Sequence, residues 1–175
     1  TYIGTPAAGD RRAAATATSI ETRLWPASGY ALVRARDASA AVTSHAMLTW
    51  SYFRGQAHKH ADEPGLVLWA AGRGWITPSG YAPYGSEQRL PVERWLGGNA
   101  PHAEGELPDS RRTSRLIGYA KGRQWAVFDA ERSNPGGAPA FRRQLVQMSG
   151  CRWMVIDHAA LAGRTTETVW TFMPD

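Results

Sequence analysis

The sequence has a single cysteine, Cys151, so no disulfide can form within the chain. Cys151 lies in the apolar context GCRWMVID, and we expect a small buried hydrophobic residue there rather than a reactive thiol. A chain of 175 residues can bury roughly 70% of its unfolded surface, so its hydrophobic core can be stable without a disulfide. The cysteine content therefore leaves the cellular compartment undecided.

Long apolar runs are also missing. No window approaches the roughly 18 consecutive apolar residues of a membrane-spanning helix, and no stretch has the pattern of a secretory signal peptide. Apolar residues do not recur at helical spacing in any sustained stretch either. These absences predict a chain without a membrane span and without a helical domain.

Acidic residues are outnumbered, because 20 Lys and Arg stand against 15 Asp and Glu and give a net charge of +5. Such an excess favours polyanionic partners in general. The basic residues are scattered in pairs along the chain, and no recognised nucleic-acid-binding signature accompanies them. We therefore expect no nucleic-acid partner, and a solvated surface for most of the pairs.

What the sequence does contain is a series of short strand patterns. Residues 29–36 alternate apolar and polar positions, and residues 47–53 are rich in aromatic and β-favouring types. Residues 65–72 form a near-continuous apolar run, as in a strand that is covered on both faces. Further strand-like segments fill residues 115–173, with NPGG, SG and AG between them as turn signals. Many short strands at regular intervals predict an all-β fold, an antiparallel β-sandwich.

The remaining segments complete the expected organisation. Residues 1–22 are rich in Ala, Thr and Gly, which predicts a lead-in segment or linker. The sandwich domain would then cover residues 23–175. Residues 85–112 hold many Gly, Pro and charged residues, so we expect a long loop with a short strand near His102.

Two histidines, His58 and His60, stand one residue apart, and Asp62 follows at the same spacing. In an extended strand such positions point to the same face. Imidazole can ligate a metal or transfer a proton near neutral pH, so one ring could hold a metal while the other handles a proton. A purely structural hydrogen-bonded pair is the alternative. His102 is a candidate third corner of the site, whereas two other histidines are expected to be surface or turn residues: His45 and His158.

The eight tryptophans divide into two groups. Those within strand patterns are expected to pack in the core or between the sheets: Trp69, Trp125, Trp153 and Trp170. Trp75 and Trp95 lie near corners or loops and are better candidates for stacking on a sugar.

The segments GYALVRAR, HKHADEPGLVLWAAGRGWITPSGY, APHA and ETVWTFMP lie in this order between about Gly29 and Pro174. Together they resemble the C-terminal β-sandwich domain of the heparinase II/III-like polysaccharide lyases, a family that includes oligoalginate lyases and heparinases. The resemblance implies a supersandwich-like fold that forms one domain of a larger toroid-plus-sandwich enzyme. The helical toroid, in the same or another chain, would carry the catalytic tyrosine. The resemblance also implies a periplasmic or secreted protein.

The resemblance further implies roles for single residues. His58 matches the catalytic-site histidine that faces the substrate, and His60 and His102 match two zinc ligands. Thr77 stands where the family has an aspartate as the third ligand, and Ala103 replaces the usual asparagine. Zinc held by two neutral imidazoles and a hydroxyl lacks the anionic ligand that helps to offset its charge. The resemblance therefore implies a zinc cofactor, but the aspartate ligand is missing because Thr77 stands in its place.

The implied reaction is β-elimination on a uronic-acid polysaccharide. The C6 carboxylate is neutralised, a base removes the C5 proton, and an acid protonates the departing oxygen. We expect Tyr81 and Tyr84 to line the substrate cleft, Arg94 to bind a carboxylate, and Trp95 to stack on a sugar. Lyase activity would require the toroid domain, so the isolated chain is expected to be inactive. The alternative is a non-catalytic β-sandwich that binds anionic polysaccharides or oligosaccharides, and a third hypothesis is an unrelated structural sandwich.

Overall fold

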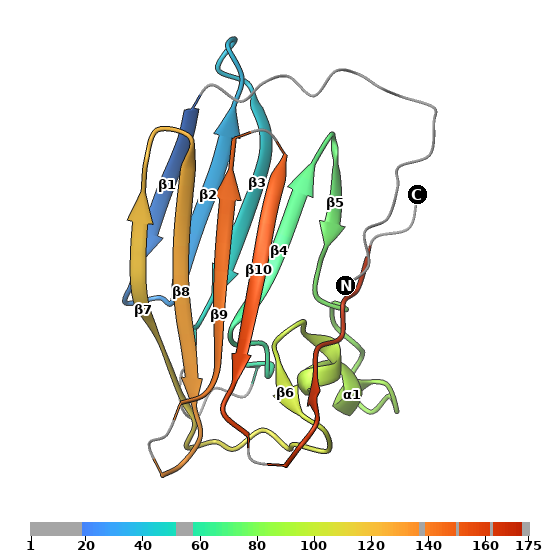
Figure 1. The fold of residues 1–175 in the computed structure, drawn as a ribbon. Coiled ribbons are helices and arrows are strands. Elements are labelled where there is room, and N and C mark those ends of the chain that lie inside the picture. Colours follow the sequence, from blue (N-terminus) through green and yellow to red (C-terminus); the bar gives the residue numbers. More distant parts are fainter. Residues whose placement is uncertain (1–18, 52–57, 137–138, 150, 162, 173–175) are drawn as a thin grey trace.

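A computed structural model describes residues 19–51, 58–136, 139–149, 151–161 and 163–172. Two antiparallel sheets pack face to face, and a two-stranded sheet and a short helix lie at one end of them (Figure 1). The predicted all-β sandwich is therefore confirmed. Among the described residues, no helix is both long and apolar enough to cross a membrane.

The first sheet is a five-stranded meander in which each strand pairs with the next along the chain. Its strands are β1 (Ser19–Trp25), β2 (Tyr30–Arg36), β3 (Val42–Thr49), β4 (Gly65–Ala70) and β5 (Arg73–Ile76). The turn from β1 to β2 requires a glycine, because Gly29 has a φ of +73° and a Cβ there would lie 2.5 Å from the Ser51 Cα. The expected boundary between the lead-in segment and the sandwich domain, after residue 22, falls inside β1.

The second sheet has four strands in the order β10-β9-β8-β7. Its strands are β7 (Thr113–Lys121), β8 (Trp125–Ser133), β9 (Pro139–Met148) and β10 (Arg152–Ala159). The small third sheet pairs β6 (His102–Ala103) with β11 (Thr166–Glu167). The connection between β5 and β7 also contains the helix α1 (Arg89–Glu93) and the 3-10 turn η1 (Trp95–Gly97).

The core lies between the two large sheets and is built from the inward positions of each strand. Val33, Leu48 and Leu66 come from the first sheet, and Phe128 and Leu145 from the second, all at most 2% exposed. Burying each such side chain contributes about 1.5–3 kcal/mol. Alternation of apolar and polar positions was predicted for residues 29–36, and the buried and outward positions of β2 follow it.

Some boundaries differ from the prediction. The strand expected at residues 47–53 is β3, which begins five residues earlier and ends at Thr49; residues 52–57 lie outside the described part. The strand expected at 65–72 is β4, but only its inner face is fully buried, since Val67 and Trp69 on the outer face are half-buried. The loop at 85–112 contains the short strand at His102 as predicted, together with two helical turns that the sequence pattern did not indicate.

Candidate functional site

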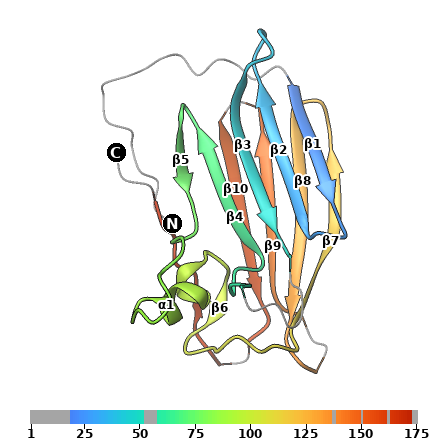
Figure 2. The same cartoon turned by 180° about the vertical axis from the view of Figure 1, so that it is seen from behind.

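The predicted site residues lie at one end of the sandwich. Residues 58–64, which precede β4, and residues 77–112, which connect β5 to β7, leave the sheets at this same end (Figures 1 and 2). Residues 58–64 form no strand, so the same-face argument for His58, His60 and Asp62 does not apply. Their positions are set instead by contacts with the β5–β7 connection.

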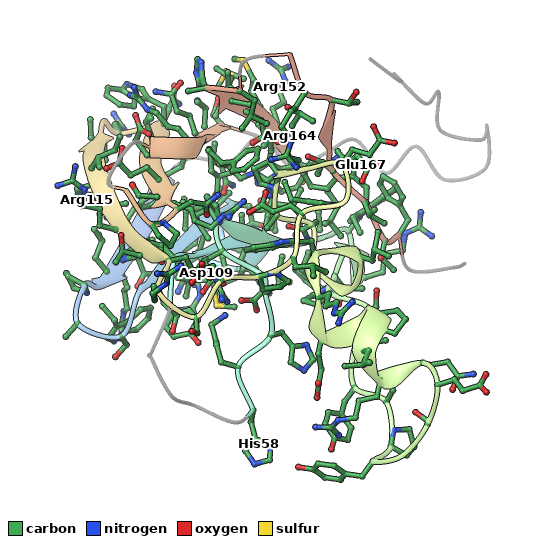
Figure 3. The ribbon with its side chains drawn as sticks, turned by 90° about the horizontal axis from the view of Figure 1, so that it is seen from below. His58, Asp109, Arg115, Arg152, Arg164 and Glu167 are labelled. Atoms are coloured by element: carbon green, nitrogen blue, oxygen red, sulfur yellow. The ribbon has the colours of Figure 1, made fainter. Side chains whose placement is uncertain are left out.

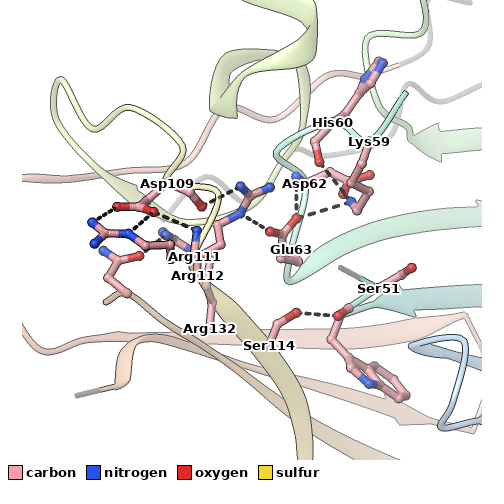
Figure 4. Close-up of polar contacts among 12 residues, drawn as sticks. Ser51, Lys59, His60, Asp62, Glu63, Asp109, Arg111, Arg112, Ser114 and Arg132 are labelled. Atoms are coloured by element: carbon pink, nitrogen blue, oxygen red, sulfur yellow. Dashed lines mark hydrogen bonds and ion pairs between the residues drawn. The ribbon is translucent and has the colours of Figure 1, made fainter. Parts of the chain in front are cut away.

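A buried carboxylate, Glu63, anchors the histidine segment (Figure 4). Its Oε1 accepts a hydrogen bond from Arg112 Nε, and its Oε2 lies 3.3 Å from Lys59 Nζ and accepts the Asp62 backbone N–H at 3.1 Å. Lys59 also pairs with the Asp62 carboxylate. The Glu63 and Arg112 side chains are 0% and 5% exposed, so this ion pair is removed from water. It joins the histidine segment to the far end of the β5–β7 connection.

A second buried group fixes the same connection to the sheets. The Asn99 side chain accepts from the Leu66 backbone N–H at 2.7 Å and donates to the Leu66 carbonyl at 2.6 Å, as a neighbouring strand would. Arg143 donates to the carbonyls of Asn99 and Pro64 at 2.6 and 2.9 Å and pairs with Asp157. The base of the site is thus a rigid part of the sandwich.

On the surface of this end, four side chains form an exposed cluster: His58, Tyr81, Tyr84 and Arg89. The Tyr84 hydroxyl lies 3.2 Å from His58 Nδ1. The Arg89 guanidinium stands 3.7 Å above the Tyr84 ring and donates to the Tyr81 hydroxyl at 2.7 Å. Figure 3 shows His58 pointing away from the sheets. The two tyrosines are 58% and 68% exposed, so the cluster is open to a ligand.

The cluster combines hydroxyl groups with a guanidinium that is paired with the Glu93 carboxylate. The hydrogen bond with Tyr81 raises the pKa of Tyr84, so its phenol stays protonated at neutral pH. The hydrogen bond to Tyr81 also raises the pKa of Arg89, and the Glu93 carboxylate 2.5 Å away adds to this. The cluster therefore offers a guanidinium, two phenols and an imidazole on one surface.

His102 lies apart from this exposed cluster and is only 3% exposed. Its Nδ1 lies 3.1 Å from the Ala100 carbonyl, to which it donates, and its Nε2 lies 3.3 Å from Glu167 Oε2 on β11. The ring stacks on Trp95 with a centroid distance of 6.1 Å. These contacts join β6 to the C-terminal segment of the chain.

The donor set fits the expected zinc ion only in part. The Nδ1 of His102 donates to a carbonyl, as in many metal-binding histidines, but its Nε2 faces the Glu167 carboxylate. The ring of half-buried His60 makes no hydrogen bond with the described residues. Thr77 supplies no anion, since its hydroxyl donates to the Pro78 carbonyl at 3.2 Å. Among the described residues, no three His, Cys, Asp or Glu side chains are grouped to hold a metal, so zinc stays a prediction.

The other predicted binding residues, Arg94 and Trp95, lie beside His102. Trp95 is 1% exposed, with the Arg132 guanidinium 4.0 Å above its ring and His102 stacked on it, so it offers no open face to a sugar. Its edge and the exposed Arg94 line a cavity of about 190 Å³. The other lining residues come from η1, β6, the loop after β6 and β11: Leu96, His102, Gly105, Glu106, Leu107 and Glu167.

Sequence reasoning missed two residues that organise this end. Arg89 stands four positions before Glu93, and that spacing is the signal of a helical ion pair that could have indicated α1. Glu63 stands four positions after Lys59, with which it pairs, but its buried partner Arg112 is distant in sequence and could not be inferred locally.

A scan against protein-family models matches residues 18–174 to the family described as heparinase II/III-like, C-terminal. A comparison with curated proteins found no match. The match spans most of the 175 residues and agrees with the antiparallel sandwich that the structure displays. The chain therefore belongs to the heparinase II/III-like C-terminal family.

Proposed function

We propose that the chain is the C-terminal domain of a lyase that cleaves a uronic-acid-containing polysaccharide by β-elimination. Family membership supports a domain related to polysaccharide lyases. The finer proposal rests on the exposed cluster, where His58 lies within hydrogen-bond reach of Tyr84 and Arg89 covers the Tyr84 ring. An arginine, two phenols and an imidazole match the carboxylate, the hydroxyls and the transferable proton of a uronate.

Each side chain of the cluster has a distinct role in this proposal. Arg89 binds the C6 carboxylate, and charge-assisted hydrogen bonds of this kind contribute about 1.5–3 kcal/mol. Neutralising the carboxylate acidifies the C5 proton. His58 contacts the carboxylate or transfers a proton, and the Tyr84 hydroxyl orients its ring through Nδ1. Tyr81 lines the site and holds Arg89 in place.

The remaining chemistry requires a partner. A helical toroid domain, in the same or another chain, is proposed to supply the second proton-transfer group. His60 and His102 are the residues that would hold a zinc ion, which would fix their two segments relative to each other; none of the steps above depends on it. A polymeric substrate agrees with the periplasmic or secreted location proposed from the family.

The test is an assay for the unsaturated product of β-elimination, with uronate polymers as substrates and the helical domain present. His58→Ala should lower kcat by about 100- to 10,000-fold, the usual contribution of a proton-transfer group. Tyr84→Phe keeps the ring under Arg89 but removes the hydroxyl bond to His58, so its effect should be smaller. Arg152→Gln, on the exposed side of β10, is the matched control for charge. Full activity of His58→Ala would refute the assignment.

The alternative function is a non-catalytic module that binds anionic glycans. The exposed Tyr81, Tyr84 and Arg89 side chains support it, because they can bind a glycan without any proton transfer. A His58→Ala variant that binds oligouronates as well as the parent, with no unsaturated product from any variant, would support this alternative.

A further inference from the structure

The outer face of the five-stranded sheet carries side chains that the site above does not use. Strand pairing places Arg23, Leu32 and Met47 side by side in one row across β1, β2 and β3. The next row runs through Arg34, His45 and Trp69 on β2, β3 and β4. Their chain neighbours on the opposite face point into the core. We refer to these six residues as the outer face.

The centre of the outer face is apolar and aromatic. The His45 and Trp69 rings stack at a centroid distance of 5.1 Å and an angle of 9°. Burial lowers the pKa of His45, and the charge of Arg34 lowers it further, so the imidazole is neutral near pH 7. Leu32 and Met47 extend this surface in the adjacent row. In Figure 2 no described helix or strand lies over the sheet on this side.

The charge of this face is positive and partly unpaired. Glu21, the single acidic residue on the outward side of β1 and β2, accepts hydrogen bonds from Arg36 at 2.9 and 3.1 Å. It also lies 3.5 Å from Arg23, whose side chain is 63% exposed. Arg34 makes no hydrogen bond or ion pair with the described residues. Its cross-strand neighbour Glu21 is hydrogen-bonded to Arg36, so Arg34 stands beside the His45–Trp69 stack with its guanidinium donors unused by the described residues.

We propose that the outer face binds an anionic polysaccharide, at a surface separate from the His58 cluster. Arg34 and Arg23 would bind carboxylates, while sugar rings pack on Met47 and on the His45–Trp69 stack. The face spans four strands, about 14 Å at the usual strand spacing, which suits several sugar units rather than one. Charge complementarity selects an anionic occupant, and membership in a heparinase-like family favours a glycan over an acidic protein. A second contact surface would hold a polymer on the protein independently of any reaction.

The experiment measures binding of oligogalacturonate to the full chain, with an uncharged maltooligosaccharide and polyglutamate as comparison ligands. Arg34→Gln should weaken oligogalacturonate binding about fivefold, the effect of losing one exposed charge contact, and should reduce its salt dependence. The matched control Arg152→Gln removes the same charge from the outward side of the other sheet and should leave affinity unchanged. Amide shifts of β2, β3 and β4 on titrating the parent protein give a second readout that needs no variant.

The outcomes separate this surface from the His58 cluster. If Arg34→Gln and Arg152→Gln lose the same amount of affinity for oligogalacturonate, the loss reflects net charge alone and the proposal is overturned. Loss of binding in Arg89→Gln, with Arg34→Gln at full affinity, would also overturn it while leaving the proposed function standing. Binding of polyglutamate as tight as that of oligogalacturonate would point to an acidic protein as occupant. Absence of any binding or amide shift at the outer face would refute the proposal outright.

Discussion

Replacing Glu63 with glutamine should unfold the protein more easily than any comparable change at the surface. The substitution keeps the shape of the side chain and removes the charge that faces Arg112 and Lys59. Because the Glu63 and Arg112 side chains are 0% and 5% exposed, water cannot replace the lost partner. Removing one member of a buried ion pair costs about 3–5 kcal/mol. Arg112 keeps its bond to the Asp109 carbonyl at 2.9 Å, so we expect the lower end of that range.

Urea denaturation of Glu63→Gln and of the parent at neutral pH measures this loss. A change of about 3 kcal/mol in a domain of this size should also lower Tm by about 6–12 °C. Asp109→Asn is the control, because its pair joins a half-buried carboxylate to the exposed Arg111 and should contribute less than about 1 kcal/mol. The double variant Glu63→Leu with Arg112→Met should recover most of the loss, since neither charge is then stranded. A loss below about 1 kcal/mol in Glu63→Gln would refute the reasoning.

Two further predictions concern stability. Asn99→Ala leaves the Leu66 backbone N–H and carbonyl without partners, and it should lower the free energy of unfolding in urea by about 2–4 kcal/mol. The control Gln124→Ala, in the exposed β7–β8 turn, should change this free energy hardly at all. Equal changes in the two variants would contradict the strand-like role of Asn99. Burial alone would raise the pKa of Asp129, but hydrogen bonds from Arg142 and Gln144 hold it below its ordinary value of 3.8. The stabilisation by this carboxylate is therefore complete above that value and is lost as the pH falls through the lower folded pKa. The unfolding free energy of Asp129→Asn should consequently fall less steeply in acid than that of the parent, and parallel pH profiles would exclude this role.

The sandwich could be predicted from the sequence because strand periodicity is local. Leu66 and Leu68 both point into the core, so Val67 between them and Trp69 after them point to the outside. The expectation that Trp69 and Trp125 pack inside was wrong for this reason: Trp125 is 44% exposed, and Trp69 lies half-buried on the outer face. Trp153 and Trp170 do pack against the core, as expected. Residue type alone misplaced two tryptophans that the alternation of their own strands places correctly.

The site could be predicted only in outline. His58, Tyr81 and Tyr84 were chosen from sequence, and the structure brings Tyr84 to His58 and Arg89 to both tyrosines. The contacts that fix their positions join residues far apart in the chain, as between Glu63 and Arg112, and no local pattern encodes such a pairing. The prediction for Trp95 was wrong, because its place in a loop suggested an exposed ring, whereas Arg132 and His102 cover the ring.

His102 shows most clearly what local sequence can and cannot specify. Its place at the start of a short strand followed from the sequence, and so did the lack of an anionic partner at Thr77. The structure provides a carboxylate from elsewhere, since Glu167 on β11 lies 3.3 Å from Nε2. Nδ1 donates to the Ala100 carbonyl, so Nε2 is the ring atom that faces the Glu167 carboxylate. This contact joins the C-terminal segment to β6, and it depends on a residue that no motif around His102 could have indicated.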